Sequence, residues 1–256
     1  MNFKTVITLL SVLTLAGCGG DSGSDSDAGP NTTASLAGLY LGSFTENPSG
    51  TNYDLAAIVA PNGKSYLMSF DGLRLYVGSL KGAGDVISGT VRAYDFVYAN
   101  AFLVVATDAA ESVSARGAFV PGDGASGSFN SNKGQAGTFS LNYLTAESEA
   151  GASFAQLEGR WAGSDEDSGE SAYIDIAADG AYSGADSDGC SVSGQISIPD
   201  ASVNVYTFTY QEVCPGLGSY SANGLMEVEQ DDEDEVLIAA LSGSGVAGVY
   251  LLTKEP

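Results

Sequence analysis

Short runs in which apolar and polar residues alternate recur along most of this chain, and Gly, Asn or Asp residues separate them. A period of two places successive side chains on opposite faces of a strand, so each run predicts a half-buried β-strand. No long segment shows the 3.6-residue period of an amphipathic helix. In the first half, the clearest predicted strands are Tyr53–Ala60, Ser65–Phe70, Leu73–Leu80, Val86–Ala93 and Thr138–Leu144. Many short strands joined by turn residues are typical of all-β barrels and sandwiches.

The second half divides into eight predicted strands. They lie near residues 158–163, 171–178, 181–185, 188–198, 203–212, 219–228, 235–242 and 246–254. Eight antiparallel strands close a small barrel whose interior is either filled by side chains or holds one ligand. The alternation along the strands is compatible with both kinds of interior.

An internal repeat indicates how the strands are grouped. Leu36–Ser43 matches Leu157–Ser164 at the Leu, both Gly and the Ser, with an aromatic residue two positions after the first Gly in each copy. The copies lie 121 residues apart, which favours two similar β domains of ordinary size. We expect antiparallel, Gly-rich barrel or sandwich domains at residues 36–147 and 155–256, with a polar linker at 147–153. One large sandwich is the alternative.

The first twenty residues have the pattern of a secretory signal peptide. Lys4 supplies a positive charge, Val6–Ala16 is apolar apart from Thr and Ser, and small residues lead to Cys18. The apolar run has about half of the ~20 residues that cross a bilayer, so we do not expect it to persist as a transmembrane helix. The ending Leu-Ala-Gly-Cys resembles the lipobox of bacterial lipoproteins. The resemblance implies that residues 1–17 are removed and that Cys18 carries a diacylglycerol and an acyl chain such as palmitate.

Residues 18–35 contain the lipidated cysteine and a run of Gly, Ser, Asp, Asn and Thr. This composition has too little apolar surface to fold, which predicts a flexible acidic linker. Gly19 stands where some lipoproteins have an Asp that retains them in the inner membrane, and this favours the outer membrane of the bacterial envelope. We therefore expect a lipid-anchored protein, facing either the periplasm or the outside.

Charge excludes several classes of partner. The chain has 9 Lys and Arg against 32 Asp and Glu, for a net charge of −23. Nucleic acids and anionic lipid headgroups need basic surfaces, so neither is an expected partner. The charge favours either attraction of cations and basic partners or simple solubility. The absence of His excludes Ser-His-Asp and Cys-His nucleophilic sites and the usual zinc sites.

The two remaining cysteines predict a disulfide and a strand register together. Cys190 and Cys214 form an even pair in an exported chain, which is typical of a disulfide. Residues that face each other in an antiparallel hairpin have a constant index sum, here 404. The same register pairs Ile198 with Tyr206 and places the tip in a turn-rich break near residue 202.

Gly159-x-Trp161, at the start of the second predicted domain, resembles the Gly-x-Trp signature of lipocalins and other calycin barrels. The resemblance implies that Trp161 packs across the closed end of a barrel, near a basic residue on the last strand. Lys254 is the candidate for that position, where the family has Arg, and Tyr40 replaces the Trp in the first half. Transferrin-binding-protein-like surface lipoproteins also combine a lipid anchor with Gly-rich β-barrels.

One acidic loop has the pattern of a calcium site. Asp165 and Asp167 are alternate carboxylates, Gly169 and Glu170 follow them, and Ca²⁺ prefers such oxygen ligands. The alternative is a solvated loop between strands. No other cofactor is expected. The five acids Asp231–Glu235 are interpreted as a charged hairpin tip.

These observations favour a binding or structural β-barrel module over an enzyme, with a protein or a small molecule as the unknown ligand. The alternative is a carboxylate-dependent envelope hydrolase. A binding module predicts an apolar or aromatic cavity, a hydrolase predicts paired acids in a cleft, and a structural role predicts a filled barrel.

Overall fold

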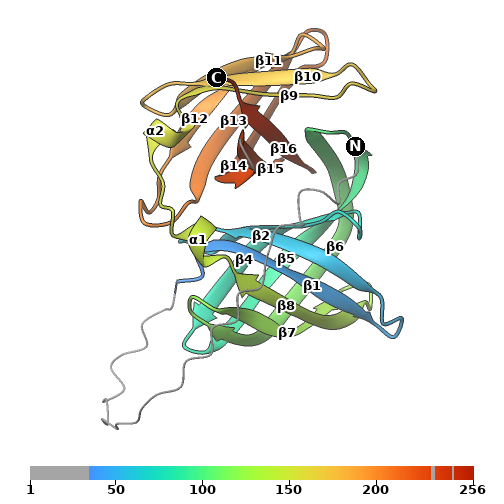
Figure 1. Ribbon diagram of the computed structural model, residues 1–256. Helices are drawn as coiled ribbons and strands as arrows, with labels where there is room; N and C mark the ends of the chain where they lie inside the picture. Colours follow the sequence, from blue (N-terminus) through green and yellow to red (C-terminus); the bar gives the residue numbers. More distant parts are fainter. Residues whose placement is uncertain (1–34, 232–233, 244) are drawn as a thin grey trace.

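Antiparallel strands form nearly all of the regular structure, which confirms the all-β prediction. The computed structural model describes residues 35–231, 234–243 and 245–256, without the side chains of residues 108–110 and 231. The predicted signal peptide at 1–17, Cys18 and nearly all of the predicted linker at 18–35 lie outside this part. The strands form two rings of eight, a lower and an upper barrel in Figure 1.

The first ring, which we call the N-terminal barrel, consists of β1–β8. Its strands are β1 (Gly38–Asn47), β2 (Asn52–Val59), β3 (Lys64–Ser69), β4 (Arg74–Ala83), β5 (Val86–Ala99), β6 (Leu103–Val120), β7 (Gly124–Ser131) and β8 (Ala136–Tyr143). Each strand pairs with the next, and β8 returns to pair with β1, which closes the ring. The inward-facing side chains form one apolar core that includes Leu55, Val91 and Leu141.

The second ring, the C-terminal barrel, consists of β9–β16. Its strands are β9 (Gly159–Ser164), β10 (Ser171–Ile176), β11 (Ala181–Asp186), β12 (Ser191–Ser197), β13 (Tyr206–Cys214), β14 (Gly218–Asp231), β15 (Asp234–Gly243) and β16 (Val246–Lys254). These lie within a few residues of the eight strands predicted from the sequence. The hairpin of β12 and β13 has the expected register, because Ser191 pairs with Val213 and Ser197 with Thr207, each with an index sum of 404.

The C-terminal barrel closes fully at one end and has a seam at the other. β16 returns to β9 through two residue pairs, Thr253 with Ala162 and Lys254 with Trp161. Over residues 246–250, β16 pairs with β6 of the N-terminal barrel instead of with β9. The seam between β9 and β16 is therefore bridged by a part of the first half of the chain.

The two barrels share an extensive contact. β5 and β6 are long strands, and their hairpin rises from the lower barrel to the upper one in Figure 1. A third apolar core fills the contact between the barrels. It includes Leu39, Ile58 and Leu75 from the first half and Leu225, Ala240 and Val249 from the second. A hydrogen bond of 2.7 Å from the hydroxyl of Tyr66 to the carbonyl of Asn223 crosses this contact.

Both barrels begin with the same local geometry. Each first strand starts at a glycine whose φ, 141° in β1 and 123° in β9, lies in the region that favours glycine. The hydroxyl of Tyr40 donates to the carbonyl of Leu36 at 2.9 Å, and the indole N–H of Trp161 donates to the carbonyl of Leu157 at 2.7 Å. In both segments, therefore, the backbone four residues earlier fixes a buried aromatic ring.

The connection between the barrels contains two short helices, α1 (Thr145–Ser148) and α2 (Phe154–Leu157), at and beside the linker predicted at 147–153. The hydroxyl of Ser148 is buried and accepts a hydrogen bond of 2.9 Å from the backbone N–H of Leu39. Ser153 and Gln156 form a capping box that begins α2. This connection is packed against the barrels. No helix in the described part of the chain has the length and apolarity needed to cross a membrane.

Candidate functional site

The C-terminal barrel contains a cavity of about 290 Å³. Exposed polar residues at the start of β10 and in the connection between β11 and β12 border its mouth: Ser171, Ser187 and Asp188. Inward-facing residues of the strands form its walls: Ile174, Tyr182, Val192, Phe208, Tyr210, Met226, Ala239, Leu241, Tyr250 and Leu252. Because side chains alternate along a strand, the apolar and aromatic half of each strand faces this space.

A hydrogen-bonded chain of polar side chains lies in this interior. Tyr210 donates its hydroxyl to the carboxylate of Glu212 at 3.2 Å, and the hydroxyls of Tyr210 and Tyr250 lie 3.2 Å apart. Burial raises the pKa of Tyr250 to about 12 and also raises that of Tyr210, so both phenols are neutral at pH 7. Burial raises the pKa of Glu212; the hydrogen bond from Tyr210 opposes the rise, and the charge of Asp186 adds to it.

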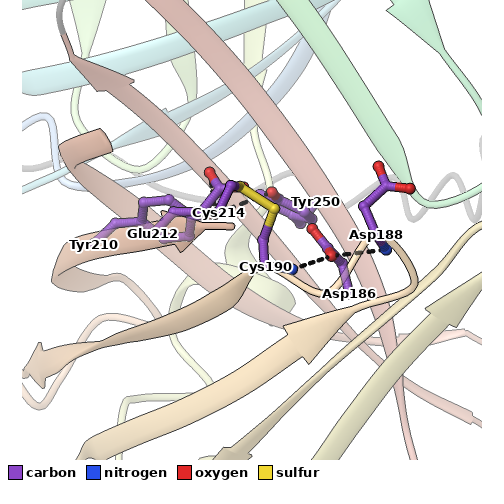
Figure 2. Close-up of a disulfide and its surroundings, with 7 residues drawn as sticks. All are labelled: Asp186, Asp188, Cys190, Tyr210, Glu212, Cys214 and Tyr250. Carbon is purple, nitrogen blue, oxygen red and sulfur yellow. Dashed lines mark hydrogen bonds between the residues drawn. A yellow bond between two sulfur atoms is a disulfide. The ribbon is translucent and has the colours of Figure 1, made fainter. Parts of the chain in front are cut away.

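The predicted disulfide lies beside this chain. Cys190 and Cys214 are joined, with Cα atoms 4.1 Å apart, which confirms the pairing predicted from their spacing. The Asp186 carboxylate accepts hydrogen bonds from the backbone N–H groups of Asp188 at 3.0 Å and Cys190 at 2.9 Å (Figure 2). The disulfide therefore fixes the turn between β11 and β12 to β13, next to Glu212.

The tip of the β5–β6 hairpin fills the seam of the C-terminal barrel. Phe102 belongs to the core of that barrel, although it lies in the first half of the sequence. The buried Asn100 holds the tip, because its side-chain oxygen accepts hydrogen bonds from the backbone N–H groups of Phe102 at 3.0 Å and Leu103 at 2.8 Å. Phe102, Leu103 and Tyr98 also line the cavity, which is thus built from both halves of the chain.

The loop predicted to bind calcium holds this tip. Asp165 accepts hydrogen bonds from the backbone N–H of Ala101 at 2.9 Å and from two backbone N–H groups of its own loop at 2.8 and 3.0 Å. These backbone hydrogen bonds lower the pKa of Asp165. Glu170 accepts from the side-chain amide of Asn100 at 2.8 Å and from the hydroxyl of Tyr98. Two of the three predicted calcium ligands are therefore engaged in joining the halves of the chain.

Among the described residues, one group of three Cys, Asp or Glu side chains has its ligand atoms within 4.8 Å of one another: Cys190, Glu212 and Cys214. Its sulfurs are bonded to each other, so the site offers no thiolate to a metal. Asp165, Asp167 and Glu170 do not form such a group. Calcium binding by this loop stays a prediction.

The closed end of the C-terminal barrel is arranged as the calycin resemblance implies. Trp161 is fully buried, and the ammonium of Lys254 lies 5.2 Å from its ring centroid. The same ammonium donates to the carbonyl of Gln156 at 2.7 Å and forms an ion pair of 2.8 Å with Glu235. Glu235, the last of the five consecutive acids, is thus paired rather than free in solvent.

The N-terminal barrel has a much smaller space, a cavity of about 70 Å³. Arg74 lies at its edge and donates at 3.0 Å to each of Asp95, Glu111 and Gln135. The two barrels therefore share an architecture but differ in their interiors, since side chains nearly fill the first.

Sequence reasoning did not identify Phe102, Asn100 or Glu212 as site residues. The predicted register contained a signal for Glu212, because it has the same parity as Cys214 and so faces the same side of β13. Phe102 and Asn100 had no such signal, since the residues of the second barrel that they contact, Gly163 and Glu170, lie more than 60 positions away in the chain.

The sequence matches no protein-family model and no curated protein. Among solved structures, the chain is similar to the crystal structure of the isotype 1 transferrin binding protein B (TbpB) from serogroup B Neisseria meningitidis. The two share 9% sequence identity with a TM-score of 0.28, over 80% of this chain and 59% of that one. This chain thus spans less than two thirds of the length of that structure.

Proposed function

We propose that the protein is a binding module whose C-terminal barrel holds one small ligand with an apolar or aromatic body. The observation that carries this proposal is the cavity of about 290 Å³, which has mainly apolar and aromatic walls and opens beside exposed polar residues. Ligand sites are typically concave, apolar and furnished with a few placed polar groups. The volume lies just below their range of roughly 300–1,000 Å³, which suits a molecule with one or two rings.

The N-terminal barrel serves a structural role in this proposal. Its interior is nearly filled, and its β5–β6 hairpin completes the wall of the other barrel through Phe102 and β6. The carboxylates at the cavity are acceptors for turn, tyrosine and hairpin hydrogen bonds. Nothing in the described geometry favours the hydrolase alternative.

The module is anchored to the outer membrane through lipid on Cys18. The supporting evidence is the lipobox-like ending of the apolar run and the polar composition of residues 18–35. The protein then meets its ligand in the periplasm or outside the cell.

Filling the cavity tests the proposal. The probe is prodan, a neutral naphthylamine dye with two fused rings whose fluorescence rises in apolar surroundings. We expect saturable binding of one dye per wild-type chain. Ala239→Phe places a ring in the cavity wall and should weaken binding at least about ten-fold, because the added ring occupies the ligand's volume.

Leu217→Phe is the matched control, because it adds a ring at a position that is 88% exposed. It should leave dye binding unchanged. Circular dichroism verifies that both variants keep their β structure. Absence of saturable binding to the wild type, or equal binding by the folded Ala239→Phe variant, would overturn the proposal.

A further inference from the structure

The charges around the cavity are unbalanced. Residues 155–256 carry 19 acidic side chains but only two basic ones, Arg160 and Lys254. Arg160 pairs with Asp175 at 2.8 Å, and Lys254 pairs with Glu235 at the closed end. Of the described residues that line the cavity, three are acidic and none is Lys or Arg. Negative charge at the cavity therefore has no basic partner in its lining.

Glu212 adds to this negative charge from inside the barrel. Its parity along β13 directs it inward with Tyr210 and Cys214, and it accepts the hydroxyl proton of Tyr210 in a hydrogen bond. The charge of Asp186 acts on Glu212 and raises its pKa, in addition to the larger effect of burial. Two like charges in a partly buried place are costly unless a positive charge offsets them.

The hydroxyl chain extends this acceptor character into the cavity. When Glu212 is ionised, Tyr210 donates to it, and Tyr250 in turn donates to Tyr210. The oxygens of both tyrosines then keep lone pairs that can accept a proton donor from a ligand. A positively charged donor gains most from such a polarised chain.

The aromatic walls of the cavity also favour a positively charged group. Seven of the residues that line the cavity are aromatic. The face of an aromatic ring carries negative charge density and attracts ammonium groups within about 6 Å, more strongly where water is excluded. The aromatic walls, the carboxylates at the mouth and the absence of Lys or Arg from the lining all favour a ligand with a positive charge.

We infer that the ligand is an organic cation, with an ammonium group near Glu212, Tyr250 and Asp186 and an apolar or aromatic body against Phe208 and Met226. This inference rests on the proposed function, since it names the class of molecule that the same cavity takes. It accounts for an interior in which acids and tyrosines, rather than bases, are the polar groups.

Three probes that share one apolar body test the sign of the charge: 3-phenylpropylammonium, 3-phenylpropanol and 3-phenylpropanoate. Calorimetric titration of the full mature chain at pH 8 measures each dissociation constant. We expect the ammonium to bind about ten-fold more tightly than the alcohol, and the carboxylate to bind most weakly.

Glu212→Gln removes the interior charge but keeps an acceptor for Tyr210. It should weaken ammonium binding several-fold and leave alcohol binding unchanged. Glu158→Gln is the matched control, because it removes an exposed charge near the closed end and should change neither affinity. The fluorescence of Trp161, the only tryptophan, verifies that each variant is folded.

The outcomes separate this inference from the proposed function. If the alcohol or the carboxylate binds as tightly as the ammonium, or if the ammonium fails to bind while the naphthylamine dye binds, the inference is wrong and the cavity still binds ligands. If Ala239→Phe blocks the alcohol but not the ammonium, surface acids bind the cation and the inference is wrong. If no probe and no dye binds, the proposed function fails as well.

Discussion

Phe102 is the point at which the first half of the chain completes the second barrel. Its side chain is 4% exposed and packs in the C-terminal core. A Cβ built on Gly163 would lie 2.5 Å from the Phe102 Cβ, so the hairpin tip directly contacts β9. Phe102→Ala removes the ring from the seam, while the hydrogen bonds of Asn100 to the tip remain available.

The loss of stability expected for Phe102→Ala follows from the burial of the ring. Replacing a buried Phe by Ala costs about 3–5 kcal/mol, partly for lost transfer free energy and partly for the space left behind. The ring borders the existing cavity, so water can reach part of that space, and we expect the lower end, about 3 kcal/mol. With a urea m value of about 2–3 kcal/mol/M, the unfolding midpoint should fall by about 1–1.5 M.

Equilibrium urea unfolding followed by Trp161 fluorescence reports on the C-terminal barrel, because the only tryptophan lies in its core. Phe102→Leu keeps most of the apolar volume and should cost about 1 kcal/mol. Leu217→Ala is the control at a position that is 88% exposed, and it should change the free energy of unfolding by less than about 0.5 kcal/mol. A Phe102→Ala variant as stable as this control would refute the conclusion that the first half completes the second barrel.

Three further changes have defined outcomes. Replacing both cysteines of the disulfide by Ser should lower the unfolding free energy by about 3 kcal/mol, because the sequence separation is 24 residues; reductant should shift the urea midpoint of the wild type but not of this variant. Burial, with smaller effects of Glu229 and Glu147, raises the pKa of Glu227 in the folded state. The folded state therefore holds this proton to higher pH than the unfolded state, so stability should fall as pH rises from about 4.5 towards the raised pKa, and Glu227→Gln should remove this fall. Cys18→Ser should release the protein from membranes or leave it unprocessed; unchanged fractionation with no lipid label in the wild type would contradict the anchor.

The sequence alone determined the features that depend on neighbours in the chain. The period of two predicted the strands of the second half, because each alternating run was bounded by turn residues. The register of β12 and β13 followed from the spacing of Cys190 and Cys214, because a hairpin pairs residues about a fixed midpoint. The strands β6 and β7 were harder to recognise, since Ala, Ser and Gly fill positions that apolar residues occupy in the other strands.

Only the tertiary structure decided the features that depend on distant residues. Phe102 packs in the second barrel against Gly163, and Asp165 accepts a hydrogen bond from the backbone N–H of Ala101. Each contact joins residues about 60 positions apart in the chain, so no local pattern encodes it. The loop whose spacing predicts a calcium site also engages this hairpin tip, through Asp165 and Glu170. Whether a barrel is hollow depends on the summed volume of all its inward side chains, so two halves with matching entry motifs enclose cavities of about 70 and 290 Å³.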